Sequence, residues 1–282
     1  MRKMNPTLRS FAALGLLLLL FAISCGAKGP QPITILHTND MHGHFVPDEA
    51  SWLDDRPLVG GFVALDHYVR RARMEASNTL LLDAGDLMTG NLICDMEYKG
   101  AEGGALLEMM NMIGYDGMVY GNHEFDKPIA NALNLAKIAD FPILCANLAD
   151  SQGTAFGSPA YNIYSSGGLK VGVIGITYHQ MAGMAKPDNL DTFHSSEPAE
   201  AVNDLVAKID DSTDLIIVLS HLGYGADQEL AGQINNVDLI IGGHSHTRIQ
   251  FPEVVNKVLI VQAGSYTQNL GRLDLVVAGD TV

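Results

Sequence analysis

The chain has 282 residues, with 17 Lys and Arg against 32 Asp and Glu, which gives a formal net charge of −15. This acidic balance excludes a protein that binds nucleic-acid polymers, because such binding needs a basic surface that displaces counterions. The length is enough for one large domain or two small ones.

Residues 1–25 have the composition of an export signal. Arg2, Lys3 and Arg9 lie before an apolar stretch at 11–23, which is shorter than the ~20 residues of a permanent membrane span. Residues 22–25 resemble a bacterial lipoprotein cleavage box with Cys25 as the lipidated first residue of the mature chain; ordinary signal cleavage nearby is the alternative. We expect an exported protein, periplasmic or on the outer surface of a bacterial cell. It would reach the membrane by its lipid anchor only, through a tether at 26–31.

Short apolar runs then alternate with longer segments of helical spacing. The apolar runs predict strands at 33–36, 79–82, 117–120, 143–146, 169–177, 215–219 and 239–241. The helical spacing predicts helices at 58–76, 105–113, 129–138 and 198–209. Fully apolar strands that alternate with helices indicate a layered α/β domain whose sheets are covered. The last strand-like segments, 258–261 and 270–277, have no helix between them, which indicates a mixed sheet or a second sheet packed on the first.

Polar residues follow five of these predicted strands, in the segments 37–44, 83–86, 120–126, 220–223 and 242–247. Loops beyond the carboxyl ends of strands are where α/β folds build their sites. The segments offer Asp carboxylates, imidazoles and an Asn carbonyl, which suit divalent ions such as Zn, Mn, Co or Mg. None of them contains Cys, which argues against a closed structural zinc site. Each segment alone is a weak signal, but the ordered set of five predicts a metal site.

Two segments carry a family resemblance. Leu36-His37-Thr38-Asn39-Asp40-Met41-His42-Gly43-His44 and Gly121-Asn122-His123-Glu124-Phe125-Asp126 resemble the calcineurin-like metallophosphoesterase superfamily. More narrowly, they resemble the N-terminal catalytic domain of the bacterial 5′-nucleotidase/UDP-sugar hydrolase family. The resemblance covers residues 33 to about 277 and implies a layered β-sandwich of mixed sheets flanked by helices, in four layers α/β/β/α. Residues 32–282 would form this catalytic domain.

The resemblance also implies a role for each matching residue. The first metal ion would be bound by Asp40, His42 and His246. The second would be bound by Asn122, His221 and His244, and Asp86 would bridge the two ions. His123, paired with Asp126, would be the catalytic histidine beside the phosphate.

These roles imply hydrolysis of phosphate esters by a metal-bridging hydroxide, with His123 and Asp126 assisting. The expected substrate is a small phosphorylated molecule of the 5′-nucleotide type. The alternatives are 2′,3′-cyclic nucleotide phosphodiesterase, UDP-sugar hydrolase or thiosulfohydrolase-like activity, and a surface lipoprotein that binds metal or a partner without catalysis.

The family resemblance also implies a C-terminal substrate-binding domain, and because the sequence ends at Val282 we expect this domain to be absent from the chain. We therefore expect either a separate chain that supplies this domain or a broader range of phosphomonoester substrates. Cys94 and Cys145 lie outside the signal segment, and their spacing leaves open whether they form a disulfide or stay separate thiols.

Overall fold

The computed structural model describes residues 29–150, 152–153, 155–179 and 193–279. The predicted signal segment and Cys25 lie outside these residues. No helix in the described ranges is long and apolar enough to cross a membrane. Cys94 and Cys145 are both buried free thiols, so they are not paired with each other.

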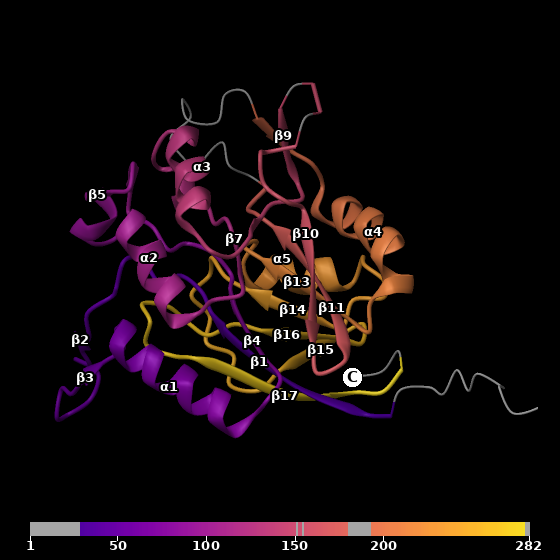
Figure 1. Cartoon of the computed structure of the whole chain (residues 1–282), viewed down its shortest axis with the longest axis horizontal. Helices are drawn as coiled ribbons and strands as arrows, with labels where there is room; N and C mark the ends of the chain where they lie inside the picture. The colour runs from indigo at the N-terminus through magenta and orange to yellow at the C-terminus, as the bar shows by residue number, and fades with distance from the viewer. Residues whose placement is uncertain (1–28, 151, 154, 180–192, 280–282) are drawn as a thin grey trace, which may run out of the picture.

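Two sheets form the centre of the molecule (Figure 1). The first has the strand order β17 (Gly271–Val277), β1 (Gln31–Thr38), β4 (Thr79–Asp83), β7 (Gly117–Val119) and β8 (Ile143–Leu144). The second has the order β10 (Tyr161–Ser166), β11 (Leu169–Ile176), β13 (Leu215–Ser220), β14 (Leu239–Gly242), β16 (Val258–Val261) and β15 (Glu253–Val255). Both are mixed: β17 and β10 are antiparallel to their neighbours β1 and β11, and β15 to β16, while the inner strands run parallel.

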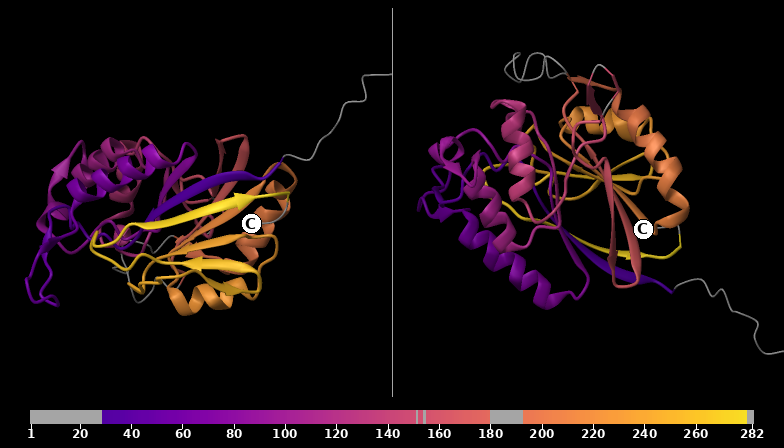
Figure 2. Two further views of the ribbon diagram at one scale, coloured as in Figure 1. Left: turned by 90° about the horizontal axis from the view of Figure 1, so that it is seen from below. Right: turned by 45° about the horizontal axis from the view of Figure 1, so that its top comes forward.

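Helices cover the outer face of each sheet, as the two views of Figure 2 show. The first sheet packs against α1 (Phe62–Glu75), α2 (Gly104–Ile113) and α3 (Ile129–Ile138), whose apolar side chains share one core with Leu36, Leu81 and Met118. The second sheet packs against α4 (Pro198–Ile209) and α5 (Tyr224–Ala231). A further core lies between the sheets. These four layers, α/β/β/α, confirm the predicted fold class.

Alternation along the strands explains this layering. In β13, Ile217 and Leu219 face the other sheet, while Ile216 and Val218 face the helices. A strand that is buried on both faces needs apolar residues at every position, which is why it appears in the sequence as an unbroken apolar run.

Short ribbons and turns complete the fold. The ribbons are β2 (Asp48–Glu49) with β3 (Leu58–Val59), β5 (Glu97–Tyr98) with β6 (Ala101–Glu102), and β9 (Leu148–Asp150) with β12 (Phe193–Ser195). Single 3₁₀ turns are η1 (Leu92–Asp95), η2 (His123–Phe125) and η5 (Asp210–Ser212).

One expectation about local structure was wrong. The helix predicted from 58 begins only at Phe62, because Gly60 and Gly61 have φ of 77° and 80°, which a helix cannot include. Two elements were not predicted, the strand β10 before β11 and the helix α5 after His221. The predicted strands at 258–261 and 270–277 exist as β16 and β17, in two mixed sheets that pack on each other.

Candidate metal centre

The predicted ligand segments meet where strands of both sheets end. Asp40 and His42 follow β1, Asp86 follows β4, Asn122 follows β7, His221 follows β13, and His244 and His246 follow β14. The strands β1, β4 and β7 are parallel in one sheet, and β13 and β14 are parallel in the other. Their carboxyl ends therefore bring all seven side chains into one cluster. Asp40, His42, Asp86, Asn122 and His221 are buried, and His244 and His246 are half-buried.

The backbone of this cluster is strained. Five of the seven residues have left-handed φ between 47° and 70°, namely Asp40, His42, Asp86, His244 and His246. A non-glycine residue in this region costs on the order of 1–3 kcal/mol. Hydrogen bonds hold the loops in place: the Asp40 N–H donates to Gly85 O at 2.8 Å, and the His42 N–H donates to Asp86 O at 3.0 Å. Strain gathered in one place is typical of a functional site.

The first group of ligand atoms comes from Asp40, His42 and His246, all within 4.8 Å of one another. The His42 Nδ1–H donates to the carbonyl oxygens of Met88 and Thr89, at 3.1 and 2.9 Å. This fixes the tautomer, so the His42 Nε2 carries a lone pair. That atom lies 3.0 Å from His246 Nε2 and 3.9 Å from Asp40 Oδ1.

The second group comes from Asp86, His221 and His244. The His221 Nδ1–H donates to Ala84 O at 2.6 Å, so its Nε2 also carries a lone pair, and this atom lies 3.0 Å from Asp86 Oδ2. Asn122 adds a carbonyl oxygen 2.8 Å from His244 Nδ1. Asp86 Oδ2 lies 4.0 Å from His42 Nε2, so this carboxylate faces both groups.

These residues fit a divalent cation. Lone pairs of buried imidazoles and carboxylates point at one another, and only a cation or a proton between them relieves the repulsion. The pKa shifts indicate the same need for a proton or a cation between these groups. Burial raises the pKa of Asp40 to about 7. Burial alone would lower the pKa of His221, but the Asp86 carboxylate outweighs it and raises that pKa to about 10. A metal ion would take the place of the proton.

His123 stands beside both groups. Its Nδ1–H donates to Asp126 Oδ2 at 2.6 Å, and Thr89 Oγ1 donates to the same oxygen at 2.7 Å. The backbone N–H of His123 donates to Asp86 Oδ1 at 2.9 Å. Burial opposes the imidazolium, yet Asp86 and Asp126 raise the pKa of His123. One ring nitrogen of His123 also lies within 4.8 Å of ligand atoms of His42 and Asp86. The partly exposed His123 therefore combines an oriented ring with a raised proton affinity.

The fold and the ligand cluster, together with a match to a known protein family, identify the family of this chain. Residues 33–248 match the family described as calcineurin-like phosphoesterase. The chain belongs to the calcineurin-like phosphoesterase family. The match contains every strand end and every predicted ligand described above.

Relatives of this chain include proteins named as nucleotidases. The chain is 32% identical over 285 residues to the trifunctional nucleotide phosphoesterase YfkN of Bacillus subtilis, covering 88% of this chain and 18% of that protein. It is 33% identical over 298 residues to the 5′-nucleotidase of Bos taurus, covering 96% of this chain and 50% of that protein. The chain thus spans half or less of the length of these relatives.

Solved structures agree on the fold. The 5′-nucleotidase precursor of Thermus thermophilus matches with a TM-score of 0.76 and 29% identity, over 88% of this chain and 54% of that one. The NAD nucleotidase of Haemophilus influenzae matches with a TM-score of 0.79 over 90% of this chain and 49% of that one. Its 23% identity supports the fold alone.

The sequence motifs contained a supporting residue to which we had given no role, Glu124. Its buried carboxylate accepts four backbone N–H groups, those of Asp86, Leu87 and Met88 at 2.9 to 3.1 Å and that of Gly121 at 2.6 Å. The loop that carries Asp86 is therefore tied to the loop that carries Asn122. Gly121 must stay small here, because a Cβ at this position would lie 2.1 Å from Asp86 Oδ1.

Two more polar residues fix the ends of β1 and β4. Asn39 Nδ2 donates to Asp40 Oδ2 and to Gly264 O, both at 2.6 Å, and so orients the Asp40 carboxylate. Asp83 accepts the Thr38 hydroxyl at 2.6 Å and the Gly85 N–H at 3.0 Å. Asp83 therefore shapes the turn at the strand end and makes no direct bond to Asp86.

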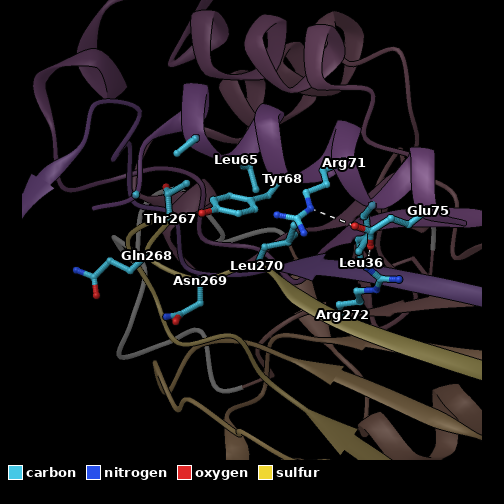
Figure 3. Close-up of a pocket in the computed structure, with 13 residues that line it drawn as sticks. Leu36, Leu65, Tyr68, Arg71, Glu75, Thr267, Gln268, Asn269, Leu270 and Arg272 are labelled. Atoms are coloured by element: carbon cyan, nitrogen blue, oxygen red, sulfur yellow. Dashed lines mark hydrogen bonds and ion pairs between the residues drawn. The ribbon is translucent and has the colours of Figure 1, made fainter. Parts of the chain in front are cut away.

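A cavity of about 520 Å³ lies elsewhere, between α1 and the segment 267–272 (Figure 3). Tyr68, Arg71 and Glu75 line it from α1, and Arg272 lines it from β17. Glu75 accepts from Arg71 Nε at 3.1 Å and from Arg272 at 2.5 Å. None of the predicted ligands lines this cavity.

Proposed function

We propose that this chain hydrolyses phosphate esters, with 5′-nucleotides as the leading substrate class, at a centre of two divalent metal ions. One observation carries the proposal. Buried imidazoles of fixed tautomer and carboxylates converge beside a partly exposed His123–Asp126 pair. Membership of the calcineurin-like phosphoesterase family supports it, as do relatives named 5′-nucleotidase.

The ligand assignment follows the two groups of donor atoms. Asp40, His42 and His246 would hold one ion. Asn122, His221 and His244 would hold the other, with Asp86 between the two groups. When bound, two divalent ions would activate a water molecule and neutralise charge on the phosphoryl oxygens. Because their charge would exceed that of Asp40 and Asp86, the loaded site would attract an anionic substrate although the chain as a whole is acidic.

The protein itself supplies positioning and a proton. Asp126 accepts the Nδ1–H of His123 and so directs Nε2 away from the loop. A proton held at Nε2 would bond to a phosphoryl oxygen and pass to the leaving oxygen as the ester bond breaks. Thr89 holds Asp126 in place, because its hydroxyl donates to the same carboxylate oxygen.

A hydrolysis panel on the purified chain tests the function. We would compare 5′-AMP, p-nitrophenyl phosphate, 2′,3′-cyclic AMP and UDP-glucose after loading with Mn²⁺, Zn²⁺, Co²⁺ or Mg²⁺, with EDTA as the control. We expect turnover of 5′-AMP that EDTA abolishes and metal restores. No turnover of any substrate with any ion would reject the enzyme and leave a metal-binding protein.

The same panel decides the second candidate function. The name of the Bacillus relative, a trifunctional nucleotide phosphoesterase, supports including cyclic nucleotides. If 2′,3′-cyclic AMP is hydrolysed faster than 5′-AMP, phosphodiester cleavage is the main reaction.

We also propose export and lipidation at Cys25, supported by the basic and apolar pattern of residues 1–25. Mass spectrometry of the mature N-terminus tests this. A lipid-modified Cys25 is the expected result, and an unmodified terminus elsewhere rejects lipidation.

A further inference from the structure

Two tyrosines flank the candidate metal centre, one beside each group of ligands. The Tyr178 ring lies on His244, with centroids 4.4 Å apart and planes 31° apart. The Tyr266 ring lies beside the other group, 5.2 Å from the ring of His246 and 5.6 Å from that of His42. The assignment of ligands uses neither tyrosine.

The backbone at or next to each tyrosine is hydrogen-bonded to a neighbouring segment. The Tyr266 N–H donates to Asp40 O at 2.8 Å, and Tyr266 has a left-handed φ of 60°. Tyr178 follows Thr177, whose N–H and C=O both bond to the side-chain amide of Asn147, at 3.0 and 2.9 Å. The backbone positions of both tyrosines are therefore set by the ligand loops and by Asn147, which reduces the ordering that binding would cost.

The two tyrosine rings are more exposed to solvent than most of the proposed ligands. Tyr178 and Tyr266 are partly exposed, as are His123, His244 and His246, whereas Asp40, Asp86 and His221 are buried. Among the described residues, the partly exposed part of the cluster thus includes both tyrosine rings beside His123, His244 and His246.

We propose that Tyr178 and Tyr266 form a subsite for a planar group carried by the leaving alcohol of a phosphomonoester, either the nucleobase of a nucleoside or an aryl ring. This rests on the proposed function and narrows its substrate class. Stacking on an aromatic side chain favours any ligand with a π face, and an aliphatic leaving group gains nothing comparable. The subsite therefore selects aromatic over aliphatic phosphate esters at the metal centre itself.

The test compares aromatic and aliphatic substrates in four variants of the full metal-loaded chain: Tyr178→Ala, Tyr266→Ala, Tyr178→Phe and Tyr266→Phe. The substrates are 5′-AMP, p-nitrophenyl phosphate and glycerol 2-phosphate. We expect each Ala variant to lower kcat/KM for the two aromatic substrates about tenfold, mainly through KM, and to leave glycerol 2-phosphate within about twofold. The Phe variants, which keep the ring, should retain the wild-type preference.

A matched control is Tyr68→Ala, because Tyr68 lines the cavity beside α1 and is more than half exposed. It should leave the ratio of aromatic to aliphatic kcat/KM unchanged. Metal content, measured by mass spectrometry, identifies any variant whose activity falls because it has lost bound metal. Equal losses for all three substrates, or an unchanged ratio, would overturn the subsite.

A binding experiment distinguishes a failure of this proposal from a failure of the proposed function. Calorimetry with 5′-AMP and glycerol 2-phosphate on the metal-loaded chain needs no turnover. Even if the wild type hydrolyses neither compound, selective loss of 5′-AMP binding in the Ala variants supports the subsite. Unchanged 5′-AMP binding in both Ala variants rejects it.

Discussion

The metal centre and the cavity beside α1 handle charge in opposite ways. In the centre, lone pairs of buried carboxylates and imidazoles point at one another on strained backbone, so that a cation or a proton is needed between them. In the cavity, the exposed Arg71 and Arg272 both pair with Glu75, and Arg272 also pairs with Asp274. The cavity thus contains its own counterions, whereas the ligand cluster requires a bound cation or proton. This requirement marks the proposed site of chemistry better than cavity volume does.

The sharpest test of this contrast is Asp86→Asn. The substitution removes a carboxylate oxygen that lies 3.0 Å from His221 Nε2 and 4.0 Å from His42 Nε2, one atom from each ligand group. We expect kcat/KM to fall by about 10³-fold or more, which exceeds the usual loss of one electrostatic donor. Turnover and metal content per chain would be measured together. Wild-type activity with two bound ions would contradict the shared-ligand role.

His123→Ala should have the next largest effect. The ring is not needed to hold the ions, so the variant should keep its metal while kcat falls by about 10² to 10⁴-fold. The measurement is kcat for 5′-AMP at saturating Mn²⁺, alongside metal content. Full activity with metal retained would remove His123 from the mechanism.

Glu124→Gln tests the backbone support of the centre. The amide brings an NH₂ group against backbone N–H donors that now bond to a carboxylate. We expect metal affinity to weaken about 10 to 100-fold, the usual effect of losing a partner that orients ligands. Metal titration by calorimetry measures it, and thermal unfolding checks that the variant folds. The matched control is Glu108→Gln on α2, whose carboxylate bonds to Lys99 at the surface, and it should bind metal normally.

Glu75→Gln, in the cavity, should have the smallest effect. Exposed ion pairs contribute little, so we expect kcat/KM to change by less than about twofold. The assay is the same 5′-AMP hydrolysis. A loss comparable to that of Asp86→Asn would mean that the two regions are coupled and that the contrast between them is wrong.

Sequence reasoning was strongest where a strand is buried on both faces. The run at 215–219 predicted β13 to within one residue, because each of its side chains meets a core. It failed at β10, whose residues are mostly half-buried and mixed in character, and which is defined by its pairing with β11. It also missed α5, an eight-residue helix that contains Gly225 and has little amphipathic pattern.

At the candidate site, sequence reasoning likewise found residues in recognisable segments and missed contacts between distant residues. Asp40, His42 and their counterparts stand in recognisable segments, so they could be chosen from the sequence, and the structure brings them together. The support given by Glu124 depends on contacts with residues about 37 positions away, and the side chain bonds to backbone atoms, which leave no pattern of residue types. The Tyr178 contact with His244 likewise joins the loops that follow β11 and β14, two strands that are not neighbours in the sheet.

The pairing of β1 with β17 decides how the molecule would be oriented when it is attached to something. Gln31 lies opposite Val277, so both ends of the described fold leave from one corner (Figure 1). The ligand loops begin after Thr38, at the other end of the same eight-residue strand, about 25 Å away at ~3.3 Å per residue. A lipid, a bead or a fusion partner attached at either end would therefore hold the molecule from behind. Its reactive edge would face the surrounding solution.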